Sequence, residues 1–177
     1  MILVSTSKYF DSKFYINHKM IQAHISCHTE VIHIAAQGMR ERKRGTIVTV
    51  SSLVGFLPSL HDPFYSGTKS FLNTYSESIA LILREFNITV QSLCPGFTHT
   101  DFHQDMNLKD EVFKNRGLKR WMSPTDVVNY SYKKLKLGRV IVIPGIANKI
   151  IYSAVKLMPK NLYYKLASKK KMLNEKC

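Results

Sequence analysis

The sequence predicts an α/β fold whose parallel sheet is built from short buried strands joined by helices. Two observations predict it. Short runs of β-branched and apolar residues, at 46–50, 88–94 and 139–143, alternate with longer segments whose apolar residues recur at helical spacing. Pro-Gly pairs close the second and third of these runs. Strands that alternate with helices imply helical crossovers, which make neighbouring strands parallel.

The first half of the chain contains two predicted helices, each followed by a strand. From Met20 to Met39 the apolar residues keep a mostly helical spacing, and Gly45 then turns the chain into the strand 46–50. Pro63 opens a second helix that runs to about Phe86, because proline suits the first helical position. The strand Ile88 to Cys94 comes next.

The second half repeats this order once and then ends in helix. The segment Ser123-Pro-Thr-Asp126 reads as a helix start, and that helix ends near Leu137-Gly138 before the strand 139–143. Residues 146 to about 173 form a predicted amphipathic helix interrupted at Pro159. No repeat or linker divides the chain, so we expect one domain over 1–177, with a helical tail at 146–177.

Composition indicates a globular protein in a reducing compartment. Of the 177 residues 45% are apolar, enough to bury a core. Cys27, Cys94 and Cys177 are odd in number and irregularly spaced, which fits neither a disulfide framework nor a metal site. Neither a signal peptide nor an uninterrupted apolar run of about 18 residues is present. We therefore expect a cytoplasmic protein.

The net charge of +14 favours anionic partners without choosing among them. Nucleic acid is not expected, because the lysines are not organised with stacking aromatics or a recognised fold signature. The segment Ile146 to Leu173 combines apolar residues with many lysines, as an interfacial membrane helix would. A helix packed on its own domain or on a dimer mate explains the same pattern. Peripheral membrane contact and a homo-oligomer therefore both stay open.

Three side chains predict a catalytic cleft. Ser52 ends one strand, and ligands of open parallel sheets bind at the carboxyl ends of the strands. Tyr65 and Lys69 are four residues apart near the start of the next helix, so they share a helix face. A phenol has a pKa near ~10, which a neighbouring ammonium lowers, so Tyr65 can exchange a proton with a substrate oxygen. Ser52 would donate a hydrogen bond to that oxygen.

Histidines supply the main alternative chemistry. Four of them, His18, His24, His28 and His33, lie in or just before the first predicted helix, and His24 and His28 at i, i+4 could both reach a metal. With no carboxylate or cysteine at a convincing spacing, no metal site is expected.

The joint pattern of three segments resembles the short-chain dehydrogenase/reductase family. The segments are GTIVTVSSLVG, YSGTKSFLNTYSESIALIL and ITVQSLCPGFTHTDF, and the likeness extends over about 20–145. The tail from Gly138 onward is similar to bacterial members grouped with 3-oxoacyl reductases and steroid-dehydrogenase-like proteins. The resemblance implies a Rossmann-type, doubly wound parallel sheet and hydride transfer between NAD or NADP and a small carbonyl or alcohol. A lipid-like or 3-oxoacyl substrate is included in that expectation.

The same resemblance implies roles for particular residues. Ser52, Tyr65 and Lys69 fall on the family's catalytic serine, tyrosine and lysine, and the last two also contact the cofactor. Its Pro-Gly motif, which lies along the nicotinamide, falls on Pro95 and Gly96. A cofactor-contacting threonine falls on Thr98 or Thr100. The family's mobile substrate loop falls on 102–121.

Two departures from the family pattern bear on activity. No Thr-Gly-x-x-x-Gly-x-Gly turn, which binds the cofactor pyrophosphate in the family, is present. We therefore expect a sheet that lacks the family's first strands, an N-terminally truncated domain, and weak dinucleotide binding. His24 also stands where the family has a catalytic asparagine. A catalytically impaired remnant is thus the alternative to an enzyme, beside the basic membrane-binding module.

Overall fold

The protein is described by a computed structural model over residues 9, 13–59, 62–100, 115 and 117–174, with side chains to residue 168. Its N-terminal elements are two helices joined by a π-helical turn, a strand, a short 3₁₀ turn and a long helix. These are α1 (Phe14–Ile21), the π-helical turn (Gln22–Ser26), α2 (Cys27–Glu41), β1 (Gly45–Val50), the 3₁₀ turn (Leu53–Phe56) and α3 (Pro63–Leu83). The C-terminal elements are β2 (Ile88–Leu93), α5 (Pro124–Leu135), β3 (Ile141–Val142), α6 (Ile146–Leu157) and α7 (Lys160–Asn174).

The described strands form one parallel sheet in the order β1-β2-β3, which confirms the predicted α/β class. β1 and β2 pair along their whole length, from Gly45 opposite Ile88 to Val50 opposite Leu93. Their carboxyl ends therefore finish level, at the same edge of the sheet. β3 joins β2 only at this end, where Ile141 lies opposite Ser92.

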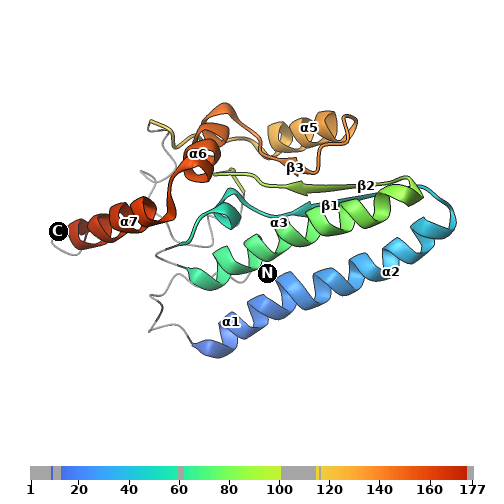
Figure 1. Ribbon diagram of the computed structural model, residues 1–177, viewed down its shortest axis with the longest axis horizontal. Helices are drawn as coiled ribbons and strands as arrows, with labels where there is room; N and C mark the ends of the chain where they lie inside the picture. Colours follow the sequence, from blue (N-terminus) through green and yellow to red (C-terminus); the bar gives the residue numbers. More distant parts are fainter. Residues whose placement is uncertain (1–8, 10–12, 60–61, 101–114, 116, 175–177) are drawn as a thin grey trace.

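Helices cover both faces of the sheet (Figure 1). On one face Ile32 of α2 and Leu83 of α3 pack with Ile47 of β1 in a buried cluster. On the other face Val127 of α5 packs against Leu93 and Val142. This second layer does not reach β1, whose Val48 and Val50 stay 41% and 53% exposed.

Two element boundaries differ from those predicted. The first helical segment begins at Phe14 rather than Met20, because α1 packs on the start of α3 through the edge-to-face contact of Phe14 with Phe64. The third strand is two residues long instead of five. Ser92 N–H still donates to the Val140 carbonyl at 2.7 Å, so this segment approaches β2 without regular pairing beyond it.

The C-terminal segment is helical and broken at Pro159, as its sequence predicts. Within the part of the chain that is described, no helix is long and apolar enough to cross a bilayer.

Candidate active site

Backbone hydrogen bonds hold the two strand ends together. Ser51 N–H donates to the Leu93 carbonyl at 2.8 Å, and Leu53 N–H donates to the Pro95 carbonyl at 2.9 Å. Ser52 lies between these two bonds and caps the 3₁₀ turn, since its Oγ accepts from Val54 N–H at 3.2 Å. The predicted serine and the Pro-Gly segment thus share one edge of the sheet.

A capped helix start positions the tyrosine and the lysine. Asp62 Oδ1 accepts from Tyr65 N–H at 2.8 Å, and Pro63 occupies the first turn of α3. One turn later, Lys69 Nζ donates to the Val50 carbonyl at 3.0 Å and lies 5.6 Å from the centroid of the Tyr65 ring. The structure therefore brings Ser52, Tyr65 and Lys69 together at the carboxyl end of β1.

Burial dominates the acidity of Tyr65. It raises the pKa of the phenol above its usual value of 10.0, and the Asp62 carboxylate raises it further. A hydrogen bond from the Ser52 side chain opposes both effects. The expectation that Lys69 lowers the pKa of Tyr65 is not met, because the net shift is upward. Tyr65 therefore carries its proton at neutral pH.

Burial also acts on Lys69, whose pKa it lowers to about 8. The backbone of this residue is fixed by Ser51, whose Oγ donates to the Lys69 carbonyl at 2.9 Å. On the same side, a Cβ at Gly55 would lie 2.8 Å from that carbonyl oxygen, so glycine permits the close approach of the 3₁₀ turn to α3. The sequence places Ser51 beside Ser52 at the strand end but predicts only Ser52 as a site residue, and it does not predict Gly55. The serine pair in SSLVG is the only signal that could have suggested Ser51.

His24 lies on the π-helical turn, facing α3. Its Nδ1 is 3.0 Å from Thr68 Oγ1, and its ring meets Tyr65 edge-to-face at 6.0 Å between centroids. Burial, with the nearby Lys69 and His28, lowers the pKa of His24 to about 4, so the ring is neutral at pH 7. Thr68 Oγ1 donates its proton to the Tyr65 carbonyl at 3.0 Å. It must then accept from Nδ1–H, which assigns the tautomer and leaves His24 Nε2 as an acceptor.

The expected cofactor residues after β2 are only partly joined to this cluster. Pro95 is tied to the 3₁₀ turn by the bond to Leu53, and Thr98 Oγ1 donates to the Gly96 carbonyl at 3.2 Å. A Cβ at Gly96 would lie 2.7 Å from Asn148 Nδ2, so this glycine packs closely on α6. Thr100 is exposed. Of the expected substrate loop, residues 102–114 and 116 lie outside the described chain.

No group of three or more metal-ligating side chains occurs among the described residues.

Comparison with known proteins decides the family. The family model described as short chain dehydrogenase matches residues 7–111, more than half of the chain. The chain belongs to this family. The same fold is found in a short-chain dehydrogenase from Sphingobium yanoikuyae, solved in complex with NADPH. That structure aligns with a TM-score of 0.72 at 18% identity, over 99% of this chain and 62% of the other.

Two curated relatives of this short-chain dehydrogenase are reductases of 3-oxoacyl groups. The 3-oxoacyl-[acyl-carrier-protein] reductase of Bos taurus is 32% identical over 115 residues, which cover 63% of this chain and 48% of the relative. The very-long-chain 3-oxoacyl-CoA reductase of Laccaria bicolor is 39% identical over 74 residues, covering 42% and 22%. The chain thus aligns with half or less of each relative's length.

The donors at the site fit the ribose of a nicotinamide nucleotide. An ammonium has three N–H donors, and Lys69 uses one of them on Val50, which leaves donors for ribose hydroxyls beside Tyr65. None of the eight glycines falls in a Gly-x-x-x-Gly-x-Gly arrangement.

Proposed function

We propose that this short-chain dehydrogenase is an NAD(P)-dependent oxidoreductase that reduces a small-molecule carbonyl to an alcohol. The observation that carries the proposal is the cluster of Ser52, Tyr65 and Lys69 at the carboxyl end of β1. The nicotinamide, when bound, supplies the hydride. The protein supplies the proton and the hydrogen bonds that hold the carbonyl oxygen.

Tyr65 is the proton donor in this proposal. Because burial keeps the phenol protonated, it is prepared to deliver a proton to the alkoxide that forms as a carbonyl is reduced. Ser52 donates toward the phenol oxygen, so its hydroxyl lies where it can turn to donate its one proton to a substrate oxygen instead. Both groups carry the protons that reduction of a carbonyl requires.

In the same proposal Lys69 binds the cofactor ribose, and His24 takes part in returning a proton to Tyr65. The Lys69 ammonium is anchored on Val50 and offers its other N–H groups to the nicotinamide ribose. After Tyr65 has given up its proton, the residue must be reprotonated. His24 Nε2, an acceptor in the assigned tautomer, can hold a water on that route. His24 would therefore offer an imidazole nitrogen as the acceptor at the position where the family has the amide of an asparagine.

A 3-oxoacyl thioester is the substrate class we propose first, because both curated relatives described above are 3-oxoacyl reductases. The competing proposal is a catalytically impaired protein. The two differ in whether the Ser52, Tyr65 and Lys69 cluster turns over substrate once the dinucleotide is held.

The test has two stages. Saturation-transfer NMR of the chain with NADPH or NADH should detect the nicotinamide ribose protons even if binding is weak, and Lys69→Ala should remove that transfer. The chain is then fused to the part of the Bos taurus relative that lies outside the aligned region and assayed with a 3-oxoacyl thioester. Tyr65→Phe should lower turnover by at least ~10²-fold, as lost general acid catalysis does, while the cofactor's dissociation constant changes little.

Lys69→Ala should behave differently in the fusion, raising the cofactor's dissociation constant and slowing turnover together. A Tyr65→Phe fusion that keeps more than about a third of wild-type turnover contradicts the assigned chemistry. An inactive wild-type fusion that still binds dinucleotide favours the impaired protein instead.

The C-terminal helices favour a second, additional function as a peripheral membrane contact of a cytoplasmic protein. Ile146, Ile150 and Leu157 follow one face of α6 and are 77%, 50% and 83% exposed. Lysines flank this stripe, and α7 adds more, which suits an anionic bilayer surface. Flotation with anionic but not neutral liposomes, lost in Ile150→Glu, would support it. Flotation that ignores lipid charge or this change would not.

We propose that the partner of this chain is a second copy of itself. Apolar side chains line the outer surfaces of the adjacent helices α2 and α3, where Val31, Ile34, Leu81 and Ile82 are at least 60% exposed. Helix faces of this kind are buried in dimers. Light scattering should report a dimer that Leu81→Glu dissociates, and a monomeric wild-type protein contradicts the proposal.

A further inference from the structure

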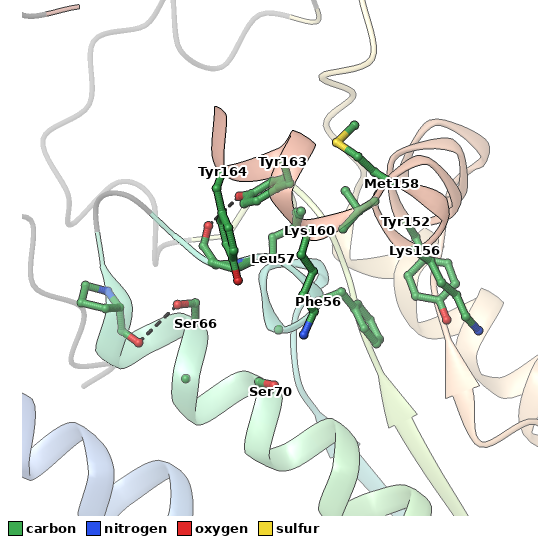
Figure 2. A pocket seen from close by; sticks show the side chains of 15 residues that line it. Phe56, Leu57, Ser66, Ser70, Tyr152, Lys156, Met158, Lys160, Tyr163 and Tyr164 are labelled. Atoms are coloured by element: carbon green, nitrogen blue, oxygen red, sulfur yellow. Dashed lines mark hydrogen bonds between the residues drawn. The ribbon is translucent and has the colours of Figure 1, made fainter. Parts of the chain in front are cut away.

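A hollow lies between the start of α3 and the C-terminal helices (Figure 2). Its volume is about 540 Å³, and small-molecule sites measure roughly 300–1,000 Å³. Tyr65 and Lys69 do not line it. The α3 residues that do are Pro63, Ser66, Gly67 and Ser70. At 3.6 residues per turn, their face is rotated by roughly 130° from that of the catalytic pair.

Small residues on α3 make the space. Ser66, Gly67 and Ser70 present almost no side-chain volume, and a Cβ added at Gly67 would meet no atom within 4 Å. The opposite wall is large and apolar. It is formed by Phe56, Leu57, Pro58, Tyr152, Val155 and Met158.

Contacts between distant parts of the chain hold this wall in place. The Phe56 and Tyr152 rings meet edge-to-face with centroids 4.7 Å apart. Tyr163 Oη donates to the Pro58 carbonyl at 2.7 Å, which ties α7 to the segment after the 3₁₀ turn. The apolar wall of the hollow is therefore held in place by packing on α6 and by a hydrogen bond from α7.

Its charge has one sign. The described residues that line the hollow include Lys156 and Lys160 and no aspartate or glutamate. Lys156 Nζ lies over the Tyr152 ring at 5.6 Å. Figure 2 shows the Lys160 side chain pointing from α7 toward α3, with the Tyr164 phenol also directed toward α3. A cation and hydroxyl groups thus face small polar residues beside an apolar wall.

We propose that this hollow binds a single-chain amphiphile with an anionic head group. The apolar tail lies against Phe56, Val155 and Met158, and the head accepts from Lys160 and from the hydroxyls of Ser70 and Tyr164. A cationic amphiphile would be repelled by both lysines, and an uncharged one would forgo the charge-assisted hydrogen bonds. The head can be a carboxylate or a phosphate ester, since both offer anionic oxygens.

The experiment measures binding to the full chain without dinucleotide. The probes are hexadecanoate, hexadecyl phosphate, hexadecanol and hexadecyltrimethylammonium, below their micellar concentrations, each displacing a fluorescent fatty acid. One or both anions should bind at least about 10-fold more tightly than the alcohol and the cation. Which anion binds better identifies the head group.

Variants locate the site. Gly67→Phe fills the hollow from a position with room for a side chain, and should weaken anion binding by at least about 10-fold. Ser78→Phe, on an exposed part of the same helix, is its control and should not. Lys160→Gln should weaken the anions by about 3- to 10-fold and leave the alcohol unchanged. Lys165→Gln removes a charge from α7 outside the lining and should have no effect.

Circular dichroism would establish that Gly67→Phe keeps its helix content. The proposal is overturned if the alcohol or the cation binds as tightly as the anions, or if Gly67→Phe binds like the wild type. It is also overturned if Lys165→Gln matches the loss caused by Lys160→Gln. Tyr65→Phe should bind the anions normally, and its failure to do so would place the ligand in the catalytic cleft instead.

Discussion

One substitution made at two glycines should shift stability in opposite directions. At Gly55 an alanine Cβ would lie 2.6 Å from Asn73 Nδ2 and 2.8 Å from the carbonyl carbon and oxygen of Lys69. Two of these three atoms are backbone atoms inside α3, which cannot move aside as a flexible side chain can. Gly55→Ala must therefore push the 3₁₀ turn away from the helix.

The magnitude follows from the overlap. Overpacking of this kind costs about 1–3 kcal/mol, which in a chain of this size lowers the melting temperature by about 2–12 °C. At Gly67 the same Cβ meets no atom within 4 Å, and the residue lies inside a helix. Gly67→Ala should raise the melting temperature by about 2–4 °C, since alanine gains up to about 1 kcal/mol over glycine there.

Thermal unfolding followed by circular dichroism compares the two variants at one protein concentration. Because the added atoms are identical, a difference in sign isolates the packing around Gly55. A Gly55→Ala protein that melts at or above the wild-type temperature would refute the close approach of the 3₁₀ turn to Lys69. The same holds if Gly67→Ala is the less stable variant.

Three further predictions concern the surroundings of the site. Gly96→Ala should destabilise the fold, because its Cβ would lie 2.7 Å from Asn148 Nδ2. In a double-mutant cycle of melting temperatures, adding Asn148→Ala should recover part of the loss. Strictly additive effects of the two mutations would contradict the contact. His24 has a depressed pKa, so the native state loses stability as pH falls from 6.5 toward 4. The melting temperature of His24→Asn should fall less steeply over that pH window than the melting temperature of the wild type. Equal pH dependence in the two proteins would show that His24 does not cause the loss. Ser123→Ala removes the cap of α5, where Ser123 Oγ accepts from Asp126 N–H at 3.0 Å. Urea denaturation should show a free energy of unfolding about 1 kcal/mol lower than that of the wild type. The control Thr125→Ala should leave this free energy unchanged.

The class of fold and the order of the main elements could be predicted from the sequence. Periodicity and turn residues are local signals, so the strands near 46–50 and 88–94 and the helix from Pro63 appear where they were expected. Ser123-Pro-Thr-Asp126 predicted its helix for the same reason, because a cap acts within one turn. The boundary at Phe14 was missed because packing on Phe64 extends that helix.

For the candidate site too, some features could be predicted from the sequence and others depend on the tertiary structure. Tyr65 and Lys69 share a face by helix geometry alone, and Ser52 follows a strand whose end points to a ligand site. The sequence thus determined which chemistry is present. Only the tertiary structure decided how that chemistry is tuned, because the pKa of Tyr65 depends on burial by neighbours that are distant in sequence. The tie from Ser51 to Lys69, the tautomer of His24 and the hollow between α3 and α7 depend on the same long-range packing.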